Sequence, residues 1–121
     1  MLVAIGVAIA SGIGGLARYG ISNQVHGDDL PWATVAINVV GSFLLGVLLV
    51  VPANWLDDGT RTTLGVGFLG GFTTFSTFSA QAFLDLEAGE PGRAALYVGA
   101  SVVLGISAAA VGYLGARAVI H

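Results

Sequence analysis

The chain has no cysteine and no lysine, and only 9% of its 121 residues are charged. The lack of cysteine excludes thiol chemistry and disulfide bonds, and it leaves the redox compartment undetermined. A soluble domain usually has about a quarter of its residues charged. With a hydrophobic share of 55% and a mean hydropathy of +0.89, the composition indicates an integral membrane protein with almost no soluble part.

The seven acidic residues are confined to three short stretches of the chain. These are Asp28 and Asp29, then Asp57 and Asp58, then Asp85, Glu87 and Glu90. The apolar segments around them are roughly 20 residues or longer, enough to cross a hydrocarbon core of about 30 Å. We therefore predict an all-α fold with one membrane domain over residues 1–121, whose four transmembrane helices span about 2–25, 31–53, 61–84 and 93–120.

The linkers between these segments are short and rich in turn-forming residues, at 26–30, 54–60 and 85–92. Short linkers force consecutive helices to run antiparallel, so both termini are expected on the same side of the membrane. The first segment lacks a basic amino-terminal region and is too long for the apolar part of a signal peptide, so we interpret it as a true span.

The four arginines show no orientation bias, because Arg61 and Arg117 lie toward one membrane face and Arg18 and Arg93 toward the other. An excess of basic residues normally marks the cytoplasmic side. Either other features select one orientation, or the chain inserts both ways and the two forms pair. The net charge of −3 and the acidic loops argue against nucleic acid as a partner.

Glycine is abundant, with 19 residues, many of them in the predicted spans. Gly41 and Gly46 in the second span, and Gly105 and Gly112 in the fourth, are typical of positions where helix backbones approach closely. Four thin helices can hardly enclose a path for a solute. A homodimer, most simply with two-fold symmetry, is therefore predicted.

The third span contains an unusual stretch at residues 65–79, in which Gly70 and Gly71 precede a cluster of hydroxyl and phenylalanine side chains. Each glycine costs about 1 kcal/mol of helix propensity. Irregular backbone survives in a membrane only where it is buried in protein or lines a wet cavity. We predict a helix break that exposes ion-binding backbone groups; the alternative is an intact helix whose hydroxyls bond to the preceding turn.

Several side chains are candidates for an ion path. Phe72, Phe75 and Phe78 recur every three residues, and the positive edges of their rings favour anions. Asn38 is an amide within an apolar span, where it serves either the ion or an interhelical hydrogen bond. Arg18 either snorkels to the interface or draws anions into a vestibule. The fourth span adds Ser101, Ser107 and Tyr97.

Three motifs in this chain closely resemble those of the Fluc (CrcB) fluoride channel family. They are Gly-Gly-Leu-Ala-Arg-Tyr at 14–19, Asn-Val-Val-Gly-Ser-Phe-Leu-Leu-Gly at 38–46 and Gly-Gly-Phe-Thr-Thr-Phe-Ser-Thr-Phe-Ser at 70–79. The resemblance implies an antiparallel, dual-topology homodimer with two fluoride pores. It also implies a central sodium ion at the dimer axis, held by the backbone carbonyls of Gly70 and Thr73 from both subunits.

The same resemblance assigns the pore residues. Phe75 and Phe78 are the implied pore phenylalanines, Asn38 the pore asparagine and Arg18 the vestibule arginine; Ser76, Thr77, Ser79, Tyr97 and Ser101 form the implied polar track. One position departs from the family, because Gln81 stands where a glutamate is common. This puts the role of that carboxylate in doubt and leaves a heterodimer with a paralogous subunit open.

The implied activity is passive fluoride flow that discharges cytoplasmic fluoride across the plasma membrane, and no Walker-type sequence suggests a fuel. An enzyme is not expected, since His26 and His121 lie in a loop and at the terminus without triad or metal spacing. A proton-coupled exporter of cationic drugs would need a carboxylate inside the membrane, and all seven acids are predicted near its surfaces. A non-conducting accessory subunit would not need the hydroxyl-rich break.

Overall fold

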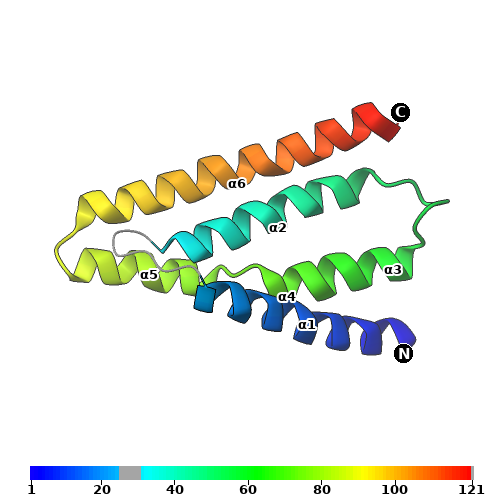
Figure 1. Cartoon of the computed structure of the whole chain (residues 1–121), viewed down its shortest axis with the longest axis horizontal. Coiled ribbons are helices and arrows are strands. Elements are labelled where there is room, and N and C mark those ends of the chain that lie inside the picture. Colours follow the sequence, from blue (N-terminus) through cyan, green and yellow to red (C-terminus); the bar gives the residue numbers. More distant parts are fainter. Residues whose placement is uncertain (25–30, 121) are drawn as a thin grey trace.

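A computed structural model describes residues 1–24 and 31–120, which form long helices lying roughly along one axis (Figure 1). The elements in chain order are α1 (Leu2–Gln24), α2 (Trp32–Val50), α3 (Asp58–Thr62), the π-helix η1 (Thr63–Leu69), α4 (Gly70–Phe72), α5 (Ser76–Glu87) and α6 (Pro91–Ile120). We call the run from α3 to α5, residues 58–87, the broken helix. Both chain ends lie at the same end of the molecule, which confirms the predicted up-and-down order (Figure 1).

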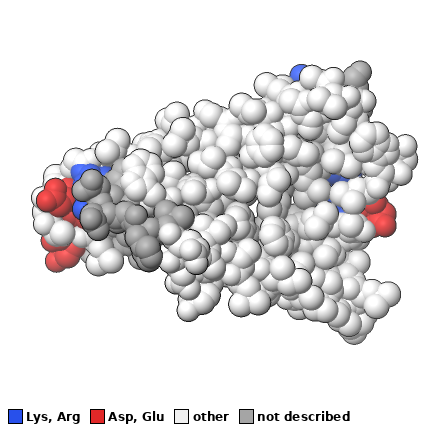
Figure 2. Space-filling model, viewed as in Figure 1, with Lys and Arg blue, Asp and Glu red and all other residues white. Residues whose placement is uncertain are grey.

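Within the described residues, α1, α2 and α6 are long and apolar enough to cross a membrane. The broken helix takes the place of the third predicted span, 61–84, and lies between α2 and α1 (Figure 1). Figure 2 shows acidic and basic side chains at the two ends of the visible face, with an uncharged band between them. This distribution fits a molecule whose middle lies in lipid.

Helix boundaries differ from the predicted ones at two positions, one set by a proline and one by a capping side chain. The second helix ends at Val50 rather than residue 53, because Val51 precedes Pro52 and is extended (φ −59°, ψ 126°). The broken helix begins before residue 61, because the Asp57 carboxylate accepts a hydrogen bond from Thr60 N (2.7 Å) and caps α3. The predicted turn at 26–30 and the terminal His121 lie outside the described residues.

Glycine contacts hold α2 against α6, as predicted. A Cβ at Gly46 would lie 2.3 Å from Ala109 O, and one at Gly112 would lie 2.2 Å from Phe43 O. These helices therefore touch backbone to backbone at both positions. Gly105 is looser, since its nearest neighbour, Ser42 Oγ, would be at 3.7 Å, an ordinary contact.

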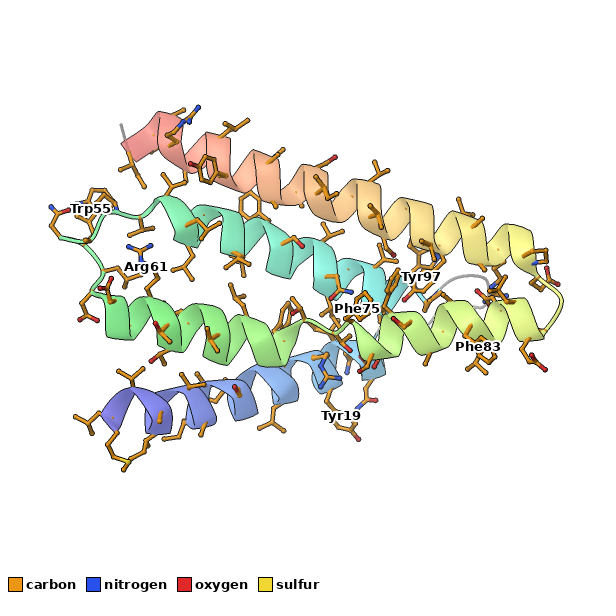
Figure 3. The ribbon with its side chains drawn as sticks, turned by 180° about the vertical axis from the view of Figure 1, so that it is seen from behind. Tyr19, Trp55, Arg61, Phe75, Phe83 and Tyr97 are labelled. Carbon is orange, nitrogen blue, oxygen red and sulfur yellow. The ribbon has the colours of Figure 1, made fainter. Side chains whose placement is uncertain are left out.

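The end of α2 is tied to the start of the broken helix by Arg61. Its guanidinium donates hydrogen bonds to the carbonyl of Leu48 in the last turn of α2 and to that of Val51 directly after it (Figure 3). Carbonyls in the last turn of a helix have no donor within the helix, and a cation there also interacts favourably with the helix dipole. Arg61 thus fixes the hairpin that joins the two helices.

Candidate functional site at the helix break

The backbone of the broken helix leaves the helical conformation at Thr73 and re-enters it at Ser76. Thr73 is extended (φ −83°, ψ 162°), and α4 ends directly before it. This confirms the predicted break, but Gly70 and Gly71 themselves remain helical. Gly71 serves packing instead, because a Cβ there would lie 2.3 Å from Ser11 O of α1.

Asn38 of α2 bonds to the backbone at the centre of the break. Its Nδ2 donates to Thr74 O (3.1 Å), and its Oδ1 accepts from Thr74 N (3.0 Å). One amide side chain therefore satisfies both backbone groups of a residue that has left the helix. Gly41, one turn along α2, makes room for the break, since a Cβ there would lie 2.3 Å from Thr73 Cγ2. Asn38 thus makes an interhelical hydrogen bond, which the sequence allowed as the alternative to an ion-binding role. Its Nδ2 keeps a second hydrogen for another acceptor.

Threonine hydroxyls form hydrogen bonds with the backbone on both sides of the break. The Thr73 hydroxyl donates to Leu69 O (2.9 Å), the bond to the preceding turn that an intact helix would also make. The Thr74 hydroxyl accepts from Thr77 N (3.3 Å) and so satisfies one of the free N–H groups at the start of α5. The break is therefore a defined conformation with its own hydrogen bonds.

On the opposite side of the break, α1 contributes Arg18, whose Nε donates to Gly71 O (3.2 Å). The side chain is partly buried and bonded to protein backbone, which is different from snorkelling to the membrane surface. The Ser11 hydroxyl donates to Gly67 O (3.2 Å) along the same interface. Sequence reasoning had missed Ser11, because its partner is 56 residues away.

An open cavity of about 410 Å³ lies beside the break, between α2, the broken helix and α6. Its lining residues are Asn38, Gly41, Ser42, Leu45, Gly65, Leu69, Gly70, Thr73, Thr74, Phe75, Phe78, Ser101, Val102 and Gly105. No lining side chain carries a charge. The Ser101 hydroxyl is buried and has no hydrogen-bond partner among the described residues, so it is a donor free to bind a ligand.

The three phenylalanines separate into two environments. Phe72 is buried (4% exposed) and stacks on Phe68, with ring centroids 5.7 Å apart. Phe75 and Phe78 line the cavity with ring centroids 6.0 Å apart, and Phe75 is 78% exposed. Figure 3 shows Phe75 beside the break, on the side of α2. The interruption of the helix thus leaves Phe75 exposed, whereas Phe78 packs against the buried residues Val35 and Tyr97.

The structure brings six of the predicted site residues together around this cavity: Asn38, Gly70, Thr73, Phe75, Phe78 and Ser101. Ser76, Thr77 and Ser79 are exposed on α5 and do not line it. Ser42 and Thr74 line it and had been missed, although Ser42 is one helical turn after Asn38 and Thr74 lies in the hydroxyl cluster.

Tyr97 lies outside the cavity but directly behind Phe78. Its side chain is fully buried, its ring centroid is 5.0 Å from that of Phe78, and its hydroxyl donates to Gln81 Oε1 (2.8 Å). Tyr97 therefore connects α6 to α5 just beyond the break (Figure 3). Gln81, the position that departs from the family pattern, is here the acceptor for a buried tyrosine.

A helical bundle with helices long and apolar enough to cross a membrane, in which a broken helix borders an uncharged cavity, defines a membrane protein with a discontinuous helix. The particular family is identified by the sequence. The model of the family described as CrcB-like protein, Camphor Resistance (CrcB), matches residues 5–113, and the chain belongs to this family.

Individual relatives agree with the family match. A protein of Novosphingobium aromaticivorans is 46% identical over an alignment of 111 positions that covers 84% of this chain and 85% of the relative. A protein of Erythrobacter litoralis is 42% identical over 121 residues, covering 92% and 89%. A protein of Geobacter sulfurreducens is 39% identical over 122 residues, covering 97% and 98%. Each of the three is named fluoride-specific ion channel FluC, and the resemblance found in the motifs is confirmed.

Proposed function

We propose that this chain forms a fluoride-selective channel through which fluoride flows passively, and that it is not an enzyme. The observation that carries the proposal is the uncharged cavity at the break, where the buried Ser101 hydroxyl has no partner among the described residues. Relatives that match nearly the whole chain are named fluoride-specific ion channels, which supports fluoride as the ion.

The chemistry of the cavity suits a small, strongly hydrated anion. Fluoride needs donors to replace its water, and the Ser101 hydroxyl and the second Nδ2 hydrogen of Asn38 are such donors. The ring edges of Phe75 and Phe78 carry the positive part of the aromatic quadrupole. Weak neutral donors in series release an ion more readily than a fixed cation, as conduction requires.

Assembly into an antiparallel homodimer with two pores is part of this proposal. The cavity is open on one side, and Phe75 is 78% exposed beside it, so a second chain would complete its wall. A paralogous subunit is the alternative partner. The balance of two arginines toward each membrane face supports insertion in both orientations.

A sodium ion at the dimer axis is also proposed, and the backbone at the break fits it. Gly70 and Thr73 line the cavity, and among the described residues neither carbonyl accepts a hydrogen bond. Leu69 O and Gly71 O, by contrast, are occupied by Thr73 and Arg18. Carbonyl oxygens are suited to replacing the hydration shell of an alkali cation. Two such carbonyls from each subunit would supply the ligands, and the ion would join the two broken helices.

We place the channel in the plasma membrane, where it would discharge fluoride from the cytoplasm. Passive flow needs no coupled ion, and the positions of the acids agree with that. Asp57 and Asp58 lie at the start of α3, at one end of the bundle, and Asp85 of α5 forms an ion pair with Arg93 of α6 (3.5 Å) near the turn at the other end (Figure 1). A proton-coupled drug exporter would instead need a carboxylate within the span.

The decisive experiment is efflux from liposomes that contain only this purified chain, loaded with fluoride or with chloride and read with ion-selective electrodes. Rapid loss of fluoride with little loss of chloride is expected, and Phe75→Ile or Asn38→Asp should abolish it. A well-folded dimer that conducts no fluoride would refute the homomeric channel and direct attention to a paralogous partner. Greater thermal stability of the dimer in sodium than in potassium would test the proposed cation site.

A further inference from the structure

The contact between α1 and the broken helix is unusually close at the level of the break. A Cβ at Gly14 would lie 2.2 Å from Phe68 O, and one at Gly71 would lie 2.3 Å from Ser11 O. The two backbones therefore touch, and neither position accepts a larger side chain without separating the helices. Arg18 lies one turn after Gly14 on the same face of α1. This closeness brings its guanidinium within hydrogen-bond distance of Gly71 O (3.2 Å).

Gly71 lies in the last turn of the first half of the broken helix, which ends at Phe72. The final carbonyls of a helix lack donors within it and form the negative end of its dipole. At this break, Leu69 O accepts from Thr73 and Gly71 O accepts from Arg18. A negative helix end beside a cavity is unfavourable for an anion, and Arg18 places a positive charge on that end.

Arg18 lies six residues before the end of α1, about 9 Å at 1.5 Å per residue, yet its hydrogen bond is to the backbone at the break and not to groups at the membrane surface. An arginine within a membrane span is costly unless it is paired with protein groups. Arg18 does not line the cavity, which lies toward α2 and α6, so it reaches the ion path only through the backbone of the break.

We infer that Arg18 is a positioning residue that caps the first half of the broken helix and offsets its negative end, so that an anion can occupy the cavity on the other side. This inference rests on the proposed channel function. It assigns Arg18 a role different from attraction of anions into a vestibule, and the two roles make different predictions for flux. A cap alters the barrier at the break, whereas an attracting charge alters the local ion concentration and is screened by salt.

The test compares Arg18→Gln, Arg18→Lys and the control Arg117→Gln in the liposome assay, over a series of fluoride concentrations and at two ionic strengths. Arg117 is an exposed arginine near the end of α6, so its substitution removes the same charge away from the break. We expect Arg18→Gln to lower the maximal fluoride rate by roughly tenfold to thirtyfold. This factor corresponds to losing the interaction of one positive charge with a partly buried helix end. The half-saturating concentration and the salt response should not change, and Arg18→Lys should retain most of the rate.

Two flux results would overturn the inference. One is an Arg18→Gln variant with an unchanged maximal rate and a higher half-saturating concentration, lost at high salt. The other is an Arg18→Gln variant indistinguishable from Arg117→Gln. If wild-type protein itself conducts no fluoride, the proposed function fails, and a second measurement still tests the position of Arg18.

That second measurement uses the absence of native cysteine. Arg18→Cys and Arg117→Cys are each treated in liposomes with a water-soluble methanethiosulfonate reagent, after gel filtration has shown that both variants are folded. A thiol packed against the break should react much more slowly than the one at position 117. Equal reaction rates would show an open, water-filled vestibule at position 18 and would overturn the inference. This test remains valid even if the Arg18→Gln variant does not fold.

Discussion

Asn38→Ala removes the two hydrogen bonds that hold the backbone of Thr74 at the break. The distances of 3.1 and 3.0 Å show that both groups of the amide are used. A side-chain hydrogen bond between membrane helices contributes about 0.6–2 kcal/mol, and a backbone group left unpaired costs about 1–3 kcal/mol. Because Thr74 is only partly buried, we expect the lower part of these ranges, roughly 2–3 kcal/mol for the pair.

The effect should be local, and hydrogen exchange measured by mass spectrometry or NMR will resolve it. Opening that is easier by about 2–3 kcal/mol corresponds to roughly thirtyfold to 150-fold faster exchange at Thr74 N–H. Amides of α6 far from the break should exchange as in wild type. The matched control is Asn54→Ala, an exposed amide in the linker before α3.

Unchanged exchange at Thr74 in a folded Asn38→Ala protein would refute a role of Asn38 in holding the break. That role would also be refuted if Asn54→Ala produced the same acceleration. Either result would mean that the break keeps its conformation without the amide of α2. Asn38 would then act on the ion alone.

Three further substitutions test other parts of the fold. Gly112→Ala should lower stability by about 1–3 kcal/mol, because the new Cβ meets Phe43 O, whereas Gly115→Ala has nothing within 4 Å and should be neutral or stabilising in thermal denaturation. Tyr97→Phe keeps the ring contact with Phe78 but loses the bond to Gln81, so a loss of about 1 kcal/mol is expected in the same assay. The hydrogen bond from Thr60 N lowers the pKa of Asp57 below its ordinary 3.8, so the cap on α3 should stabilise fully above that value and weaken as the pH falls below it. Exchange protection at the start of α3 should therefore fall in acid, and Asp57→Ala should remove this dependence.

The fold was largely predictable because its determinants are local. The lengths of the apolar segments set the helices, and short polar linkers set their alternating directions. Asp57, Pro52 and Pro91 set helix ends by capping or by backbone restriction, although the predicted boundaries were off by a few residues at those positions. The break was predicted from glycines and hydroxyls, yet it begins only at Thr73, because Gly71 is held in the helix by its contact with α1.

Residue chemistry likewise determined the composition of the candidate site. Polar side chains within apolar spans, and phenylalanines interleaved with hydroxyls, are candidates for a functional site. Four such residues do line one cavity: Asn38, Phe75, Phe78 and Ser101. The regular spacing of three phenylalanines did not separate Phe72 from the other two. Helical periodicity stops at the break, so only the path of the chain decides that Phe72 is buried, that Phe75 is exposed and that Phe78 packs against Tyr97.

The sequence by itself determined that this is a membrane bundle with a broken helix, because hydrophobic length, turn chemistry and helix propensity act between neighbours along the chain. Only the tertiary structure decided the partners of the polar side chains. Asn38 meets Thr74, Arg18 meets Gly71 and Tyr97 meets Gln81 across separations of 36, 53 and 16 residues. Each pairing depends on how closely two helices approach. For Asn38 and Arg18 that approach is permitted by Gly41, and by Gly14 and Gly71, which contact helices far away in the sequence.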